Sequence, residues 1–418
     1  MRQATTGFAA ILFLMFNLVV AARAADQPTA EVLHWWTSGG EAKALKVIAD
    51  RFTAEGGRWI DNPVAGGGGD AARMVAKTRI LGGNPPTVMQ WHLGLSLKQL
   101  AQEGLLGDVQ DVAVSEHWDS LLPPLIATNA KVDGRYVAIP IDIHGENWLW
   151  TNPKLLAGAG VEPPKTWPEF NAAAAKLRQA GYIPLALGAQ DWQETIVFAD
   201  LVLGIGGVDF YRKTLIELDP GALASAKMVE IFAELAVIRG LMDPGAGNRT
   251  WNETTNLLIT GKAAMQFMGD WAKGEFAAAG MTAGRDFGCV LAPGVTDAYV
   301  VAADAFAVPR VTDAHQRAGQ LLMAKTIMEP EVQRDFSLAK GSIPPRRDIA
   351  PDGFDPCSRL AMKIVRESPN LLPSLGSGMA VPPAQGGAIS DAIASFFASG
   401  MTPEAGAKAL VEAIAASR

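Results

Sequence analysis

Hydrophobic runs alternate with amphipathic segments along the first third of the chain, which predicts strands connected by helices. In the first amphipathic segment, Ala44, Leu45, Ile48 and Phe52 recur at helical spacing. The expected helices span 41–55, 71–81 and 95–103, and the expected strands span 31–36 and 87–91, with a further strand possible between the first two helices. This alternation favours an α/β sheet with ligand loops at the carboxyl ends of its strands.

The remaining pattern predicts a second lobe that is richer in helices. Thr166 is an expected N-cap with Glu169 completing a capping box, and Ala- and Leu-rich helices are expected from there to residue 240. Further elements are expected as strands at 135–140, 147–151 and 299–309, helices within 252–280, a connector at 343–356, and helices at 384–397 and 403–416. We assign 25–140 and 296–342 to the N-terminal lobe and 141–295 and 343–418 to the C-terminal lobe.

The first 24 residues are typical of a secretory signal peptide. Arg2 precedes an apolar stretch, and Ala22-Arg23-Ala24 offers a small-x-small cleavage pattern. We therefore expect an exported, periplasmic protein, without a later transmembrane run. In an oxidising compartment Cys289 and Cys357 could form one disulfide; the alternative is two separate buried thiols.

Composition and motifs exclude several function classes. The 418 residues carry a net charge of −7 and a pI near 5.4, which argues against nucleic-acid binding. There is no G-x-S-x-G, H-E-x-x-H or phosphate-loop motif, and the five histidines show no metal-ligand spacing. We expect no catalytic residues, no metal and no cofactor, although a pair of glycosidase carboxyls need not be close in sequence.

Tryptophan is the unusual feature of the composition, with 11 Trp against 4 Tyr. Six of them stand beside polar residues in expected loops or helix starts, where indole faces could cover the C–H face of a sugar while polar groups bind its hydroxyls. These six are Trp35, Trp36, Trp91, Trp192, Trp251 and Trp271, and the five interpreted as structural are Trp59, Trp118, Trp148, Trp150 and Trp167. The pattern indicates carbohydrate binding.

Each of these signals also has a structural interpretation. One of Trp35 and Trp36 could belong to the core, because successive side chains of a strand point to opposite faces. His92 could be a surface histidine, Glu41 a favourable charge in the first turn of a helix, and Asp270 an N-cap.

Several segments together resemble the extracellular solute-binding protein family 1 of bacterial ABC transporters. They are Lys165-Thr166-Trp167-Pro168-Glu169-Phe170, Gly261-Lys262-Ala263-Ala264-Met265 and Gly269-Asp270-Trp271, in matching order across about residues 30–415. The similarity extends to the glucose/mannose-binding branch through Trp35-Trp36 with Glu41, Asn84-Pro85-Pro86, residues 208–213, residues 270–275, and Ala303-Asp304.

The resemblance implies a two-lobed periplasmic binding protein fold, type II-like, with hinge crossings between the lobes. It implies a monomeric receptor that captures a monosaccharide such as glucose and delivers it to a membrane permease. Trp36 and Trp271 would stack on the pyranose, helped by Trp35 or Trp251. The hydroxyls would be bound by Glu41, Gln90, His92, Asp304 and Lys340, with Gln190, Asn252 and Asp142 as further candidates.

One segment departs from the branch. Relatives place a His-Gly pair before Met-Ala, whereas this chain reads Gly376-Ser377-Gly378-Met379-Ala380. A receptor for an oligosaccharide, polyol or sugar derivative therefore stays open, as does a periplasmic carbohydrate-processing enzyme.

Overall fold

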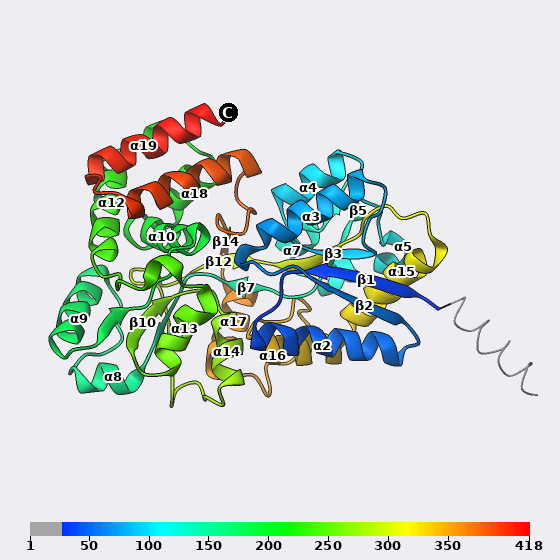
Figure 1. The fold of residues 1–418 in the computed structure, drawn as a ribbon, viewed down its shortest axis with the longest axis horizontal. Helices are drawn as coiled ribbons and strands as arrows, with labels where there is room; N and C mark the ends of the chain where they lie inside the picture. Colours follow the sequence, from blue (N-terminus) through cyan, green and yellow to red (C-terminus); the bar gives the residue numbers. More distant parts are fainter. Residues whose placement is uncertain (1–26) are drawn as a thin grey trace, which may run out of the picture.

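The N-terminal lobe is built on a five-stranded sheet with strand order β2-β1-β3-β13-β6 (Figure 1). The computed structural model describes residues 27–418, so the expected signal peptide at 1–24 lies outside the described residues. The strands are β1 (Thr29–His34), β2 (Arg58–Pro63), β3 (Val88–His92), β6 (Ala138–Pro140) and β13 (Asp304–Ala307). β1 pairs in parallel with β2 and β3, whereas β13 runs antiparallel to β3 and β6.

Helices connect and cover this sheet, as the amphipathic segments predict. The strand possible between the first two helices is confirmed as β2. The helices are α2 (Gly39–Ala54), η1 (Gly67–Gly69), α3 (Asp70–Leu81), α4 (Leu95–Gln102), α5 (Gln110–Ser115), α6 (Trp118–Leu121), α7 (Pro124–Asn129), α15 (Ala314–Met328) and α16 (Pro330–Lys340). β4 (Lys131–Val132) and β5 (Arg135–Tyr136) form a separate two-stranded antiparallel hairpin.

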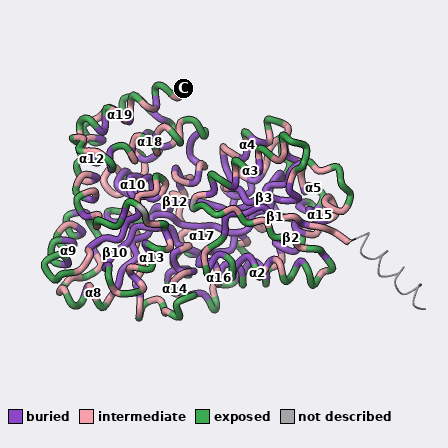
Figure 2. The backbone as a smooth tube through the Cα atoms, in the orientation of Figure 1, coloured by how far each residue is buried: buried purple, intermediate pink, exposed green. Residues whose placement is uncertain are grey.

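The C-terminal lobe contains a four-stranded sheet with strand order β11-β8-β10-β9. Its strands are β8 (Trp148–Thr151), β9 (Ile183–Leu185), β10 (Ala263–Phe267) and β11 (Gly288–Leu291). The helices of this half are α8 (Pro153–Gly158), α9 (Trp167–Gln179), α10 (Asp191–Leu215), α11 (Pro220–Leu223), α12 (Ala226–Arg239), η2 (Ala246–Asn248), α13 (Trp251–Ile259), α14 (Ala272–Ala278), α18 (Pro383–Ala398) and α19 (Pro403–Ala416). Figure 2 shows buried backbone running through the middle of both halves.

A three-stranded sheet, β14-β12-β7, lies where the chain passes between the lobes. Its strands are β7 (His144–Gly145), β12 (Ala298–Ala302) and β14 (Asn370–Pro373), and α17 (Pro356–Glu367) precedes β14. The crossings from β6 to β7 and from β12 to β13 therefore lead from one sheet to another. The structure confirms the two-lobed α/β class, while the residue limits assigned to each lobe stay a prediction.

The structure corrects four local expectations. The first strand ends at His34, so Trp35 and Trp36 follow it instead of lying within it. The expected strand at 299–309 is two strands of different sheets, β12 and β13, because the sequence is apolar on both sides of the crossing. The expected strand at 135–140 is likewise divided between β5 and β6, and the expected helical stretch at 252–280 includes the buried strand β10.

The helix-start prediction at Thr166 holds in part. The Thr166 hydroxyl accepts from the Glu169 N–H at 3.3 Å, as expected for an N-cap. The Glu169 carboxylate, however, accepts from the N–H of Lys165 at 2.8 Å instead of closing a box with Thr166. A complete capping box instead begins α2, between Ser38 and Glu41.

Cys289 of β11 and Cys357 of α17 form a disulfide across 68 residues of sequence. Within residues 27–418, no helix combines the length and the apolar character needed to cross a bilayer.

The two lobes approach closely beside the first turn of α2. A Cβ placed on Gly40 would lie 2.7 Å from the carbonyl carbon of Gly274 in α14, so only glycine fits there without a shift. The Gly40 N–H also donates to Glu275 Oε1 at 3.0 Å. This contact joins the lobes at the edge of the cavity described next.

Candidate ligand-binding site

A cavity of about 270 Å³ lies between the lobes. All predicted sugar-contact residues line it except Gln90 and Asp142. We call Trp35, Trp36, Glu41, His92, Asp304 and Lys340 the first wall, because they come from the N-terminal sheet and its helices. The second wall consists of Glu146, Gln190, Trp192, Trp251, Asn252, Trp271 and Ser377, and His144 lies between the two walls.

The two tryptophans that follow β1 are held tightly in the first wall. The Trp35 N–H donates to Gln90 Oε1 at 3.0 Å, and its ring meets the His92 ring edge-on at 5.2 Å. Trp36 is 1% exposed and packs against Phe336 at 5.2 Å between ring centroids. Trp36 is thus both a core residue and part of the cavity lining, which combines the two interpretations of this pair.

Glu41 caps α2 and also faces the cavity. Its carboxylate accepts from the N–H groups of Thr37 and Ser38, both at 3.2 Å, and lies 3.6 Å from Lys340 Nζ. Burial raises the pKa of Glu41, and the Lys340 charge acts in the opposite direction. Lys340, at the last turn of α16, also lies 5.7 Å from the Trp36 ring centroid. The cap fixes the carboxylate at the position where it meets the only ammonium group of the cavity lining.

Asp304 is the second carboxylate of the first wall. Gln90 Nε2 donates to its Oδ1 at 3.1 Å, and His92 Nε2 lies 3.4 Å from the same oxygen. Burial would raise the pKa of Asp304, but its contact with His144 and the nearby charges hold it well below its usual range. Burial lowers the pKa of His92 to about 4, so its imidazole is neutral at pH 7. Gln90 thus lies behind the wall and positions Asp304 and Trp35.

His144 stands among three carboxylates, all of which have other expected roles in the sequence. Its Nδ1 bonds Asp270 Oδ1, and its Nε2 lies 3.0 Å from Asp142 Oδ2 and 3.4 Å from Asp304 Oδ2. Burial opposes the charged form of His144, yet Asp142 and Asp270 together raise its pKa well above its usual range. Asp142 is fully buried behind His144 and does not line the cavity. Asp270 is not the N-cap of α14, because that position is Trp271.

The second wall supplies indole rings and amides. The ring centroid of Trp271 lies 6.0 Å from that of Trp192 and 5.2 Å from that of His144, whose ring it meets edge-on. Trp251 and Asn252 are the first residues of α13, which opens with a capping box between Thr250 and Glu253. Gln190 precedes α10 and accepts from Gln193 at 2.7 Å.

Glu146 is a cavity residue that sequence reasoning missed. Its Oε1 accepts from the Ser377 hydroxyl at 2.6 Å and its Oε2 from the Ser374 hydroxyl at 2.5 Å. Burial raises the pKa of Glu146, against the two serine hydrogen bonds. Ser377, the departure from the glucose/mannose branch, therefore holds a carboxyl group that faces the cavity.

His144 and Trp192 were also missed as contacts. His144 belongs to none of the recognised motifs, although it follows strand β6 in the segment that crosses between the lobes. Trp192 was among the six tryptophans beside polar residues, but no segment of the resemblance pointed to it. Trp91 was in the same group, yet it is 3% exposed, donates to Ser96 Oγ at 2.9 Å and lies outside the cavity lining.

Sequence relatives match nearly the whole chain. The profile of the family described as "Bacterial extracellular solute-binding protein" matches residues 36–323. A "Probable sugar-binding periplasmic protein" of Brucella suis biovar 1 (strain 1330) is 39% identical, over 100% of this chain and 99% of the relative. A protein of the same name from Rhizobium meliloti (strain 1021) is also 39% identical, over 99% of each chain.

Solved structures show the same fold at low identity. A "Chitin oligosaccharide binding protein" superposes with a TM-score of 0.81 at 18% identity, covering 94% of this chain and 99% of that one. The bacterial solute receptor AcbH, described with an exclusive preference for b-D-galactopyranose, superposes with a TM-score of 0.79 at 18% identity, covering 92% of this chain and 97% of that one. At such identities the likeness concerns the fold alone. The family is shown instead by the profile match, which covers most of the chain. This chain belongs to the bacterial extracellular solute-binding protein family.

Proposed function

We propose that this protein is the periplasmic sugar receptor of an ABC importer, and that it captures a monosaccharide such as glucose between its lobes. The observation that carries the proposal is one cavity in which the indoles of Trp192 and Trp271 meet the hydrogen-bonding groups of Glu41, Asp304 and Lys340. A pyranose needs both, since its C–H face is apolar and its rim carries hydroxyls.

The charges of the first wall favour a neutral sugar. Lys340 is paired with Glu41, and Asp304 with His144, so neither wall offers an unpaired cation to a sugar acid. Paired, buried carboxylates are strong acceptors for hydroxyl groups, and a missing hydroxyl would leave them without a partner. The site therefore selects its ligand through the positions of hydroxyls.

Ligand capture would close the cleft. The cavity lining comes from both lobes, and a sugar that touches both stabilises the closed form by contacts made only there. The Gly40–Glu275 contact between α2 and α14 joins the two lobes beside the cavity. A monomer in this form would be presented to the membrane permease, and the relatives named periplasmic support a periplasmic location.

A calorimetric titration with glucose, mannose, galactose and xylose tests the proposal. We expect saturable binding of at least one sugar with one site per chain, accompanied by a change in Trp fluorescence. No response to any monosaccharide or disaccharide would contradict a sugar receptor. Recovery of intact sugar from the complex is also expected, whereas turnover would favour the carbohydrate-processing enzyme.

A second chamber supports a longer ligand as the alternative. This chamber, of about 480 Å³, shares Gly68, Gln190, Trp192, Gly376 and Ser377 with the cavity. A sugar in the cavity could therefore continue, through a glycosidic bond or another substituent, past Ser377. Tighter binding of a disaccharide than of its component monosaccharides would favour an oligosaccharide or sugar-derivative receptor.

A further inference from the structure

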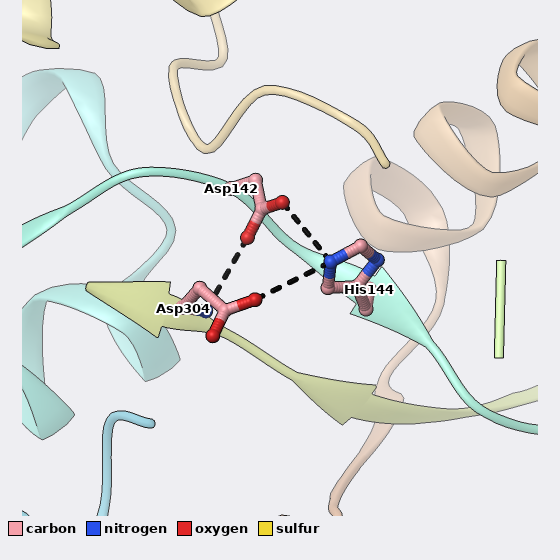
Figure 3. Close-up of side chains that lie close together, drawn as sticks. All are labelled: Asp142, His144 and Asp304. Carbon is pink, nitrogen blue, oxygen red and sulfur yellow. Dashed lines mark hydrogen bonds and ion pairs between the residues drawn. The ribbon is translucent and has the colours of Figure 1, made fainter. Parts of the chain in front are cut away.

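We propose that Asp142, His144 and Asp304 bind a small divalent transition-metal ion, of which zinc is the probe, between the two walls (Figure 3). The three side chains come from the β6–β7 crossing and from β13, and each is almost fully buried. One donor atom from each lies within 4.8 Å of the other two. In Figure 3, Asp142 and Asp304 both face the same ring nitrogen of His144.

The spacing of the donor atoms suits a small ion. His144 Nε2 is 3.0 Å from Asp142 Oδ2 and 3.4 Å from Asp304 Oδ2. Zinc lies about 2.0–2.2 Å from nitrogen and oxygen ligands, which places neighbouring donors roughly 3–3.5 Å apart. One imidazole with two carboxylates suits zinc better than calcium, which prefers six to eight oxygens.

The atoms that would not contact the metal are already held by hydrogen bonds. Asp270 bonds Nδ1 of His144, so Nε2, which faces Asp142 and Asp304, is the nitrogen that a metal would bind in place of a proton. The N–H of Asp304 donates to Asp142 Oδ1 at 3.3 Å, and Gln90 donates to Asp304 Oδ1 at 3.1 Å. A carboxylate on the distant nitrogen of a metal-binding histidine is the usual outer partner, because it fixes the ring and its tautomer.

Two of the inward-facing atoms meet only each other and Asp304, in ion-pair contacts that lack hydrogen-bond alignment. They are Asp142 Oδ2 and His144 Nε2, both buried, and although 3.0 Å apart they are not aligned for a hydrogen bond with each other. Buried polar atoms are rarely left without a partner, because the loss of hydration is costly. A metal ion that replaces the Nε2 proton of His144 would coordinate both atoms at once and keep a positive charge between the carboxylates.

The site would keep an open coordination position on the side of the cavity, because His144 and Asp304 line it while Asp142 does not. Three protein ligands and one open position are typical of zinc sites that exchange water. A sugar hydroxyl could take that position; this last step, unlike the metal site itself, rests on the proposed sugar-receptor function.

Calorimetric titration of the metal-stripped, sugar-free protein with zinc chloride tests the site. We expect one ion per chain and at least tenfold weaker binding in Asp142→Asn and in His144→Gln. Asp270→Asn, which alters only the outer partner, is expected to weaken binding about 10–100-fold. The exposed His117 serves as the matched control, and His117→Gln should bind zinc as the unaltered protein does.

Diffraction at the zinc absorption edge keeps the test independent of how the variants fold. An anomalous peak within bonding distance of all three donor atoms supports the proposal. A peak elsewhere, the absence of a peak, or zinc binding that Asp142→Asn and His144→Gln leave unchanged overturns it. Because no sugar is present, these outcomes are independent of the sugar-receptor proposal.

Discussion

The two walls of the cavity stabilise their buried carboxyl groups in different ways. In the first wall each carboxylate meets a cationic partner, Glu41 with Lys340 and Asp304 with His144. In the second wall Glu146 is held by the neutral hydroxyls of Ser374 and Ser377, and burial raises its pKa. The first wall is therefore fixed by charge, whereas the second relies on hydrogen bonds and aromatic rings.

The largest effect is expected from removing the cation of the first wall. Lys340→Met keeps the length of the side chain but leaves Glu41 buried without its partner, and removing one member of a buried pair typically costs about 3–5 kcal/mol. Urea unfolding followed by circular dichroism measures the loss. Adding Glu41→Gln to Lys340→Met should recover part of it. An Asn252→Ala control on the second wall should change stability by less than about 1 kcal/mol.

The next effect should appear in binding instead of folding. Trp271→Ala removes a half-buried indole that contacts Trp192 and His144 in the cavity lining, so we expect sugar affinity to fall about 100-fold or more, which is at least about 2.8 kcal/mol. Calorimetry measures the affinity, and the melting temperature should stay close to that of the parent protein. Trp59→Ala, outside the cavity, is the control and should bind normally. Loss of the fold in Trp271→Ala would mean that this ring is part of the core.

The same contrast explains what sequence reasoning could and could not find. The Trp35–Trp36 pair was predicted because a strand ends there, and Glu41 and Asp304 because their segments resemble a known branch. Glu146 gave no signal, because its part in the cavity depends on two serines more than 220 residues away. The break between β12 and β13 was hidden for a similar reason, since both strands are apolar and only their partners differ.

A third effect depends on pH and concerns Glu194, a buried residue of α10. Burial, with the charge of Asp191 adding to it, raises the pKa of Glu194 in α10 to about 8 from 4.5. Between these values the unfolded chain loses the proton and the folded chain keeps it, so this group makes stability fall as pH rises from about 4.5 to 8. Glu194→Gln should therefore be more stable than the parent by about 1–3 kcal/mol at pH 8.

Urea unfolding at pH 4 and pH 8 measures that difference. At pH 4 the carboxyl is protonated in both states, so the advantage of Glu194→Gln should vanish. An equal advantage at both pH values would show that packing of the amide, and not ionisation of Glu194, is responsible.

The smallest expected effect tests whether Glu146 or Ser377 itself acts on the ligand. Both Ser374 and Ser377 donate to Glu146, but only Ser377 lines the cavity. If the serines act by orienting the carboxyl group, Ser374→Ala and Ser377→Ala should each weaken sugar binding about five- to tenfold, near the 1 kcal/mol net value of one hydrogen bond. Neither change should then matter further in a Glu146→Ala background, because coupled residues are not additive. A loss confined to Ser377→Ala and persisting in that background would instead mean that the serine contacts the sugar directly, and that the second wall selects its ligand through a hydroxyl group.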